Sequence, residues 1–120
     1  DATRGGVAGV LSELAEASAV GLTLDETALP VRPEVVGVCD ILGLEPLFLA
    51  NEGKLVAVVP QAEAEAALAA LRAHPLGRQA AAIGTVEQAG PYGPSVVLRN
   101  AFGGRRTVTM PSGEQLPRIC

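Results

Sequence analysis

The sequence predicts a mixed α/β domain in which helices pack against one sheet. Segments with the apolar spacing of helices alternate with short β-prone segments, and β-prone segments dominate the last third of the chain. Of the 120 residues, 48% are hydrophobic and only 2% are aromatic, so an aliphatic core can be buried. This length corresponds to one domain of ordinary size. A single sheet covered by helices is the simplest way to bury the apolar faces.

The first two expected elements are a helix and a strand. Residues 6–18 are predicted to form an amphipathic helix that is entered through Gly5-Gly6, because apolar residues recur at helical spacing. The spacing assigns these residues to the buried face: Val7, Val10, Leu11 and Leu14. The next segment, "VGLTLDE", alternates apolar and polar residues and therefore predicts a half-buried strand.

The middle of the chain is expected to continue as helix, strand and helix. The segment "PEVVGVCDILG" predicts a helix with Pro33 in its first turn and Gly43 at its end. The apolar run "KLVAVVP" predicts a central strand that is covered on both sides. The segment "QAEAEAALAALRAH" is rich in helix formers and predicts a third helix. The apolar faces of the two helices are expected to be Val35, Val38, Cys39 and Leu42, and Ala64, Ala67, Leu68 and Leu71.

The last third is predicted to be a β-meander followed by a tail. Turns rich in glycine and proline separate three short β-prone segments. These segments are "AAIGTVEQ", "SVVLRN" and "RRTVTM". From Pro111 onward the periodicity is lost, so we expect an α/β domain over residues 1–110 and a flexible, extended tail over residues 111–120. Such a tail could span up to about 33 Å.

Charge and cysteine content exclude several classes of function. The net charge is −4, with 13 acidic and 9 basic residues, which does not favour nucleic acid or an anionic membrane as partner. No apolar run approaches the roughly 20 residues of a membrane-spanning helix. Two cysteines are too few for a disulfide framework, so a reducing, cytoplasmic setting is expected. No cluster of ligands has the spacing of a metal site.

Two polar segments are candidates for binding or catalysis. "DATRGG" (residues 1–6) precedes a helix, and its glycines, its Arg4 and the helix amides could bind an anion. The alternative is a glycine-assisted helix entry without a ligand. In "ANEGK" (residues 50–54), Glu52 is expected at the start of the central strand, where it could act as a general base. The alternative there is a solvated acid in a turn. His74, which precedes a proline at a helix end, is expected to be structural.

The two cysteines have different expected roles. Cys39 lies on an apolar helix face and is predicted to be a small buried side chain. Cys120 ends the chain, and a prenylation signal is excluded because Pro117 occupies the position that such a signal requires. A thiol on an extended arm could reach a site on another domain or subunit, whereas an incidental terminal cysteine is the simpler alternative.

Five segments carry a resemblance to a known family. They are "DATRGG", "LANEGKLVAVVP", "LRAHPLGRQAAAIG", "AFGGRR" and "GEQLPRIC". Together they resemble the HypE family of hydrogenase maturation proteins over essentially the whole chain, and the terminal "PRIC" is the most specific part. That family is similar to the aminoimidazole ribonucleotide synthetases and selenophosphate synthetases, which have two α/β domains and usually form dimers. The resemblance implies that this chain is the C-terminal domain and that an ATP-binding domain precedes Asp1, which would explain the absence of a start methionine.

The resemblance also implies an activity for the parent protein. Cys120 would accept a carbamoyl group that HypF makes from carbamoyl phosphate. ATP would then activate the carbamoyl oxygen, and loss of phosphate would give S-cyanocysteine. The cyanide would pass to iron on the HypC–HypD complex for assembly of the nickel–iron hydrogenase centre. The fragment alone is expected to be inactive, because ATP with Mg would be bound mainly by the absent N-terminal domain.

Individual residues carry these implied roles. Cys120 matches the carrier, and Glu52 matches the position expected to accept protons. The loop that faces the nucleotide phosphates matches Thr3, Arg4, Gly5 and Gly6. Ala2 departs from the proline usual in the family, which affects the stiffness of this loop. Two alternatives remain: a non-enzymatic α/β interaction module, or a domain of another synthetase of the same superfamily.

Overall fold

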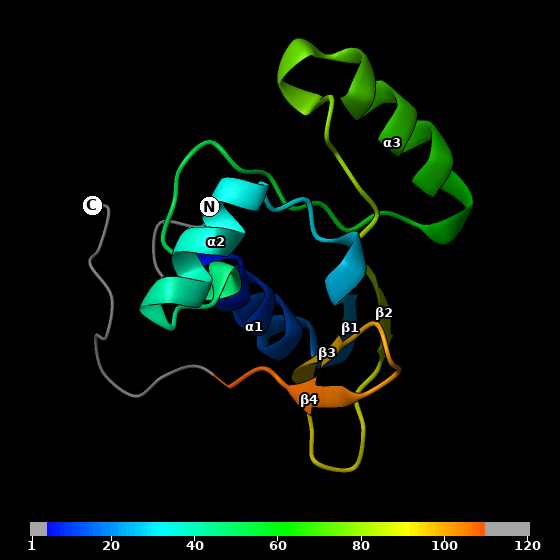
Figure 1. Cartoon of the computed structure of the whole chain (residues 1–120). Helices are drawn as coiled ribbons and strands as arrows, with labels where there is room; N and C mark the ends of the chain where they lie inside the picture. The colour runs from blue at the N-terminus through cyan, green and yellow to red at the C-terminus, as the bar shows by residue number, and fades with distance from the viewer. Residues whose placement is uncertain (1–4, 110–120) are drawn as a thin grey trace.

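A computed structural model describes residues 5–109 and shows a mixed sheet, helix α1 packed against it, and two further helices (Figure 1). The elements are α1 (Gly6–Ser18), β1 (Val20–Asp25), α2 (Pro33–Leu42), α3 (Ala64–Ala73), β2 (Gly84–Gln88), β3 (Ser95–Arg99) and β4 (Arg105–Thr107), with short 3₁₀ turns between them. The mixed α/β class is therefore confirmed. The predicted site residues Thr3, Arg4 and Cys120 lie outside the described residues.

The four strands are ordered β2-β1-β3-β4, so the predicted meander is wrong. Strand β1 runs parallel to β3 and antiparallel to β2, and only β3 and β4 form a hairpin. The reason lies in burial. Leu22 and Leu24 of β1 are 5% and 3% exposed, and Thr23 between them is also buried, as suits a central strand. Every residue of β2 is exposed, as suits an edge.

Helix α1 has the predicted bounds but a different buried face. Leu11 is buried as predicted, whereas Leu14 is 38% exposed. Ala8 and Ala15 are buried in its place, at 0% and 1% exposure, because small side chains let the helix approach β1 and β3 closely. The core comprises Ala8, Leu11, Ala15, Leu22, Leu24, Leu47, Val96, Leu98 and Val108.

The apolar run at residues 54–60 is not a strand, so the prediction of a covered central strand is wrong. Both neighbouring positions of β1 in the sheet are occupied, by β2 and by β3. Only Val56 of this run packs partly against the core, and Leu55 is 76% exposed. The apolar composition of this run predicted a central strand, but the central positions of the sheet are taken by β1 and β3.

The two remaining helices form where predicted but bury little. Cys39 is the buried residue of α2, at 3% exposure, which confirms its predicted burial. Helix α3 has no fully buried residue, and its main contacts are with the adjoining 3₁₀ turns Gln61–Glu63 and Pro75–Gly77. Figure 1 shows α3 standing apart from the sheet; the extended run at residues 50–60 leads to it, and a second extended segment leads from it to β2. Within residues 5–109, no helix has both the length and the apolarity to cross a membrane.

Candidate functional site

The described part of the predicted phosphate loop is the glycine pair that opens α1. Gly5 and Gly6 have φ angles of +66° and +64°, a left-handed conformation that glycine adopts without steric cost. The amide of Gly9 then donates to the carbonyl oxygen of Gly5 at 3.0 Å, which begins the helical hydrogen bonding. The pair therefore serves as a helix entry, as the simpler interpretation of this motif required.

Gly6 also allows a close approach between two distant parts of the chain. A Cβ atom at this position would lie 2.5 Å from the carbonyl oxygen of Leu47 and 2.6 Å from that of Leu49. These residues belong to or follow the 3₁₀ turn η2 (Pro46–Phe48). No side chain larger than hydrogen fits between α1 and this turn. The contact brings the segment that precedes Glu52 against the start of α1.

The start of α1 presents the backbone amides of a helix N-terminus. No side chain of the described residues caps this helix, and its first turn carries no acidic residue. The first amides of a helix lack internal partners and carry a partial positive charge. These amides can therefore donate hydrogen bonds to a phosphate group. Among the described residues, the donors are backbone amides alone, so they do not by themselves define a nucleotide site.

Asn51 and Glu52 follow the segment that contacts Gly6. The side-chain amide of Asn51 donates to the carbonyl oxygen of Leu49 at 2.9 Å, while its Oδ1 atom is buried and has no hydrogen-bond partner among residues 5–109. Glu52 is exposed in a bend and is not followed by a strand, so its predicted position at the start of a central strand is wrong. The sequence marked Asn51 only as a turn residue, and its buried Oδ1 atom beside the predicted acid is an additional polar group of this segment.

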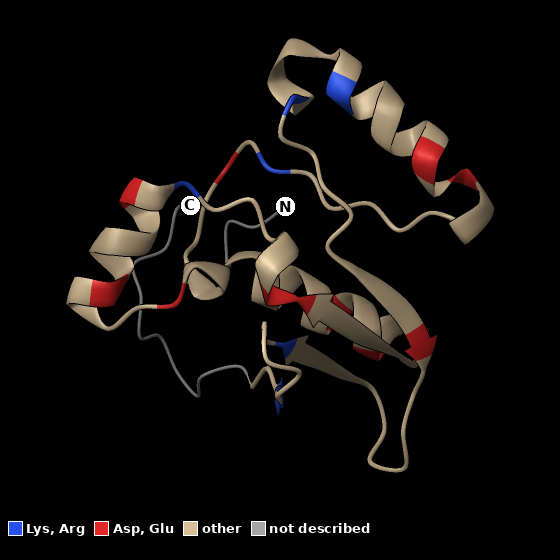
Figure 2. Cartoon of the chain, turned by 45° about the vertical axis from the view of Figure 1, so that its right-hand side comes forward, with Lys and Arg blue, Asp and Glu red and all other residues tan. Residues whose placement is uncertain are grey.

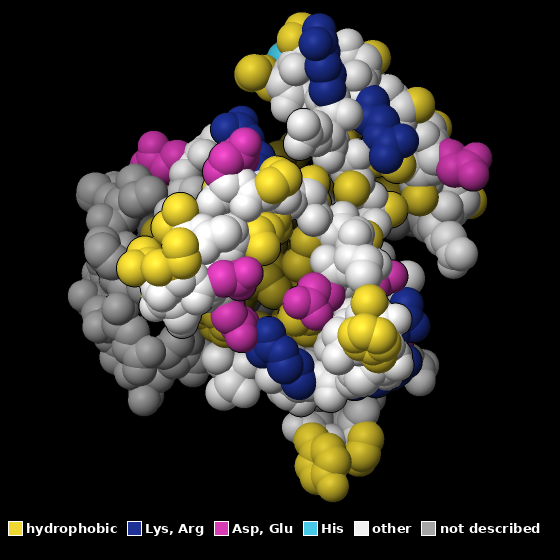
Figure 3. All heavy atoms as spheres, in the orientation of Figure 1, with side chains coloured by type: hydrophobic (Ala, Val, Ile, Leu, Met, Phe, Trp, Pro, Cys, Tyr) yellow, Lys and Arg dark blue, Asp and Glu magenta, His cyan; other side chains and the backbone are white. Residues whose placement is uncertain are grey.

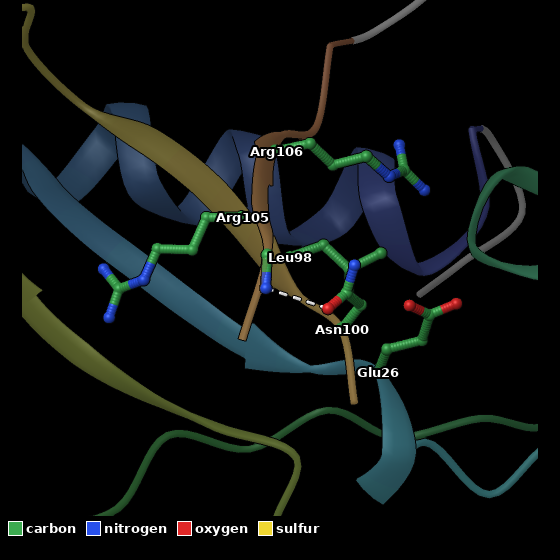
Figure 4. Close-up of a pocket in the computed structure, with 6 residues that line it drawn as sticks. Glu26, Leu98, Asn100, Arg105 and Arg106 are labelled. Atoms are coloured by element: carbon green, nitrogen blue, oxygen red, sulfur yellow. Dashed lines mark hydrogen bonds between the residues drawn. The ribbon is translucent and has the colours of Figure 1, made fainter. Parts of the chain in front are cut away.

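A cavity of about 140 Å³ lies beside the β3–β4 turn (Figure 4). It is lined by Glu26, Leu98, Asn100, Gly104, Arg105 and Arg106. The Oδ1 atom of Asn100 accepts hydrogen bonds from the amides of Phe102 and Gly104, both at 2.9 Å, which fixes the turn. Arg106 donates from one nitrogen to both carboxylate oxygens of Glu45 at 2.9 Å. These polar groups hold the hairpin in place.

His74 has a local structural role, as predicted. Its Nδ1 atom accepts a hydrogen bond from the amide of Leu76 at 3.1 Å and caps the 3₁₀ turn Pro75–Gly77. Within residues 5–109, no group of three or more histidine, cysteine or acidic side chains could hold a metal ion. Figure 2 shows acidic and basic residues interspersed over the elements.

The fold and the glycine-opened helix define a class of protein. The family model described as "AIR synthase related protein, C-terminal domain" matches residues 1–96. The match covers most of the chain, and the chain therefore belongs to this family.

Within that family the chain is similar to one particular protein. It is 59% identical to carbamoyl dehydratase HypE of Rhodobacter capsulatus, over 100% of this chain and 35% of that relative. The crystal structure of E. coli HypE superimposes with a TM-score of 0.90 at 51% identity, over 100% of this chain and 36% of that one. The chain thus spans about a third of the length of the curated relatives it matches.

Two further solved structures include a ligand or partner in their descriptions. One is HypE in complex with ATP, which matches with a TM-score of 0.89 at 49% identity, over 100% of this chain and 36% of that one. The other is a HypE–HypF complex, with a TM-score of 0.86 at 40% identity, over 92% of this chain and 35% of that one. ATP and HypF are thus bound by proteins similar to this chain.

Proposed function

We propose that this chain is the C-terminal domain of a HypE-type carbamoyl dehydratase, and that Cys120 is its carbamoyl and cyano carrier. The observation that carries the proposal is the match to HypE over the full length of the chain, at 59% identity in sequence and a TM-score of 0.90 in structure. Residues 1–110 form the anchoring domain, and residues 111–120 form the carrier arm. The ATP-binding domain lies in the remainder of the parent, which works in the cytoplasm as a homodimer.

The proposed reaction removes water from a thiocarbamate in two steps. In the first, the γ-phosphoryl group of Mg-bound ATP is transferred to the carbonyl oxygen of S-carbamoyl-Cys120, and one N–H proton is lost. In the second, the C–O bond breaks, phosphate leaves with the remaining proton, and the carbon forms a triple bond to nitrogen. The Sγ–C bond is retained throughout, so the product is S-cyanocysteine. HypF supplies the carbamoyl group, and the HypC–HypD complex receives the cyanide.

Residues near the start of α1 and Glu52 are assigned roles in this reaction. Thr3, Arg4, Gly5 and Gly6 face the nucleotide phosphates, and the uncapped amides at the start of α1 support this role. Glu52 accepts the N–H proton in the first step. The contact of Gly6 with residues 47–49, which precede Glu52 by a few positions, supports this role. Glu52 is exposed to solvent in this chain, so its carboxylate is accessible to the S-carbamoyl group on Cys120.

The experiment that tests the function localises the modification by mass spectrometry. The full-length parent is incubated with HypF, carbamoyl phosphate and ATP, digested, and the peptide that ends in Cys120 is analysed. We expect a carbamoyl adduct on Cys120 that converts to a cyano adduct when ATP is available to the parent. An unmodified Cys120, or an adduct on Cys39 instead, would contradict the proposal and favour an interaction module with an incidental terminal cysteine.

Replacing Glu52 by glutamine is expected to slow dehydration by about 10²- to 10⁴-fold, the usual contribution of a general base. Carbamoylation of Cys120 should continue at its normal rate, because that step takes place with HypF. The conversion of the carbamoyl to the cyano adduct is measured over time by intact mass. Glu63→Gln, in the exposed turn before α3, is the matched control and should have no effect. A normal dehydration rate for Glu52→Gln would show that another group accepts the N–H proton of the carbamoyl group.

A further inference from the structure

The side chain of Asn51 ties the residue before Glu52 to the turn that precedes it. Its amide nitrogen donates to the carbonyl oxygen of Leu49 at 2.9 Å. Its Oδ1 atom is buried and has no hydrogen-bond partner among residues 5–109. A buried acceptor without a partner costs free energy, whereas an apolar side chain of similar volume would not. Stability alone therefore does not account for an asparagine at this position.

We propose that Asn51 is a positioning residue for the dehydration and that it acts through Glu52. Its hydrogen bond to Leu49 fixes the backbone at residue 51, and the next residue carries the carboxylate that accepts the N–H proton of the carbamoyl group. The buried Oδ1 atom of Asn51 does not take part in the chemistry. The inference rests on the proposed function, because this role exists only if Glu52 is the general base.

The turn to which Asn51 is bound is itself anchored in the fold. Leu47, in η2, is 8% exposed and belongs to the hydrophobic core. The carbonyl oxygen of Leu49 lies against the start of α1, since a Cβ atom at Gly6 would be only 2.6 Å from it. The hydrogen bond to this oxygen therefore connects Asn51 to a part of the chain that is held by the core and by α1.

The residues that follow Asn51 have no comparable anchor. Residues 52–55 are all exposed, and a Cβ atom at Gly53, where φ is +77°, would meet no atom within 4 Å. The ion pairs among residues 5–109 do not include Glu52; they are Arg99–Asp25 and Arg106–Glu45. Figure 3 shows basic side chains spread over the visible face of the molecule instead of gathered in a patch. The direction in which Glu52 projects therefore depends on how the residue before it is held.

The test is a double-mutant cycle on the ATP-dependent conversion of the carbamoyl to the cyano adduct. The full-length parent is first loaded with HypF and carbamoyl phosphate, and conversion at saturating ATP is followed by intact mass. A general base acts only within hydrogen-bond reach of the proton. Asn51→Ala should therefore slow conversion by about two- to tenfold, the fold-change that corresponds to one net hydrogen bond. In the Glu52→Gln background, the same substitution should have no further effect.

Two further variants separate positioning from stability. Asn51→Leu loses the hydrogen bond to Leu49 but also removes the buried acceptor, so its unfolding midpoint in urea should stay close to that of the parent. Its conversion rate should nevertheless fall as in Asn51→Ala. Asn100→Ala is the matched control, because the Oδ1 atom of Asn100 fixes another turn by accepting from the amides of Phe102 and Gly104. This control should lower the unfolding midpoint and leave the conversion rate of the folded protein unchanged.

Either of two results would overturn this inference. A normal conversion rate in Asn51→Ala would show that the hydrogen bond to Leu49 does not matter for the reaction. Equal slowing by Asn51→Ala with and without Glu52→Gln would show that Asn51 acts on the fold or on another group. The unsubstituted parent keeps these results distinct from a failure of the proposed function. If it forms no cyano adduct, the proposed function falls and this inference with it; if it does, only the role of Asn51 is at stake.

Discussion

Replacing Cys120 by serine in the full-length parent is expected to abolish ATP-dependent formation of the cyano adduct. The thiolate is the nucleophile that takes up the carbamoyl group, and a serine hydroxyl is not ionised at neutral pH. The product also contains an S–C bond that serine cannot form. Intact-mass analysis after incubation with HypF, carbamoyl phosphate and ATP should show neither the carbamoyl nor the cyano species.

Cys39→Ser is the matched control for this experiment. Cys39 is 3% exposed on the inner side of α2, so it is not accessible to a carbamoyl donor. Serine at this position buries a hydroxyl group and should lower the free energy of unfolding by about 1–3 kcal/mol. Product formation should nevertheless persist under conditions in which the variant is folded. A cyano adduct in Cys120→Ser, or its loss in a folded Cys39→Ser, would contradict the assignment of the carrier.

The helices could be predicted from the sequence because their signals are local. Pro33 in the first turn and Gly43 at the end define α2, and Gly43 adopts a φ of +69° as a helix-ending residue does. The Ala-rich composition of α3 and the glycine entry of α1 likewise depend only on nearby residues. Such signals specify where a helix begins and ends without reference to its partners.

The pairing of the strands and the side chains that pack in the core could not be predicted in the same way. The parallel pairing of β1 with β3 joins residues more than 70 positions apart, such as Leu22 and Val96. The spacing on α1 favoured Leu14 for the core, but the buried position went to Ala15, since close approach to the sheet selects small side chains. The run 54–60 shows that apolar composition alone indicates neither a strand nor its burial.

The sequence singled out the residues of the candidate site, but it did not indicate which of their segments pack together. Gly5, Gly6 and Glu52 were recognisable from local motifs and from the resemblance. The packing of Gly6 against Leu47–Leu49 joins residues about 40 positions apart, and no local pattern announces such a contact. The close approach at Gly6 therefore joins the helix entry to residues 47–49, the segment that precedes Glu52.

Replacing Gly6 by alanine is expected to destabilise this chain by about 2–5 kcal/mol. The left-handed backbone, with φ at +64°, costs an L-residue about 1–2 kcal/mol. The added Cβ would also lie 2.5 Å from the carbonyl oxygen of Leu47, a backbone atom that can yield only if the 3₁₀ turn moves. Overpacking of this kind typically costs about 1–3 kcal/mol more. The free energy of unfolding is measured by urea denaturation monitored by circular dichroism.

Gly43→Ala separates the two contributions. Gly43 has nearly the same backbone angle, with φ at +69°, but a Cβ there meets no atom within 4 Å. This control should lose only the conformational part, about 1–2 kcal/mol. The difference between the variants then measures the steric cost of separating α1 from η2. Equal losses would show that the turn shifts freely and that Gly6 does not fix the packing of α1 against residues 47–49.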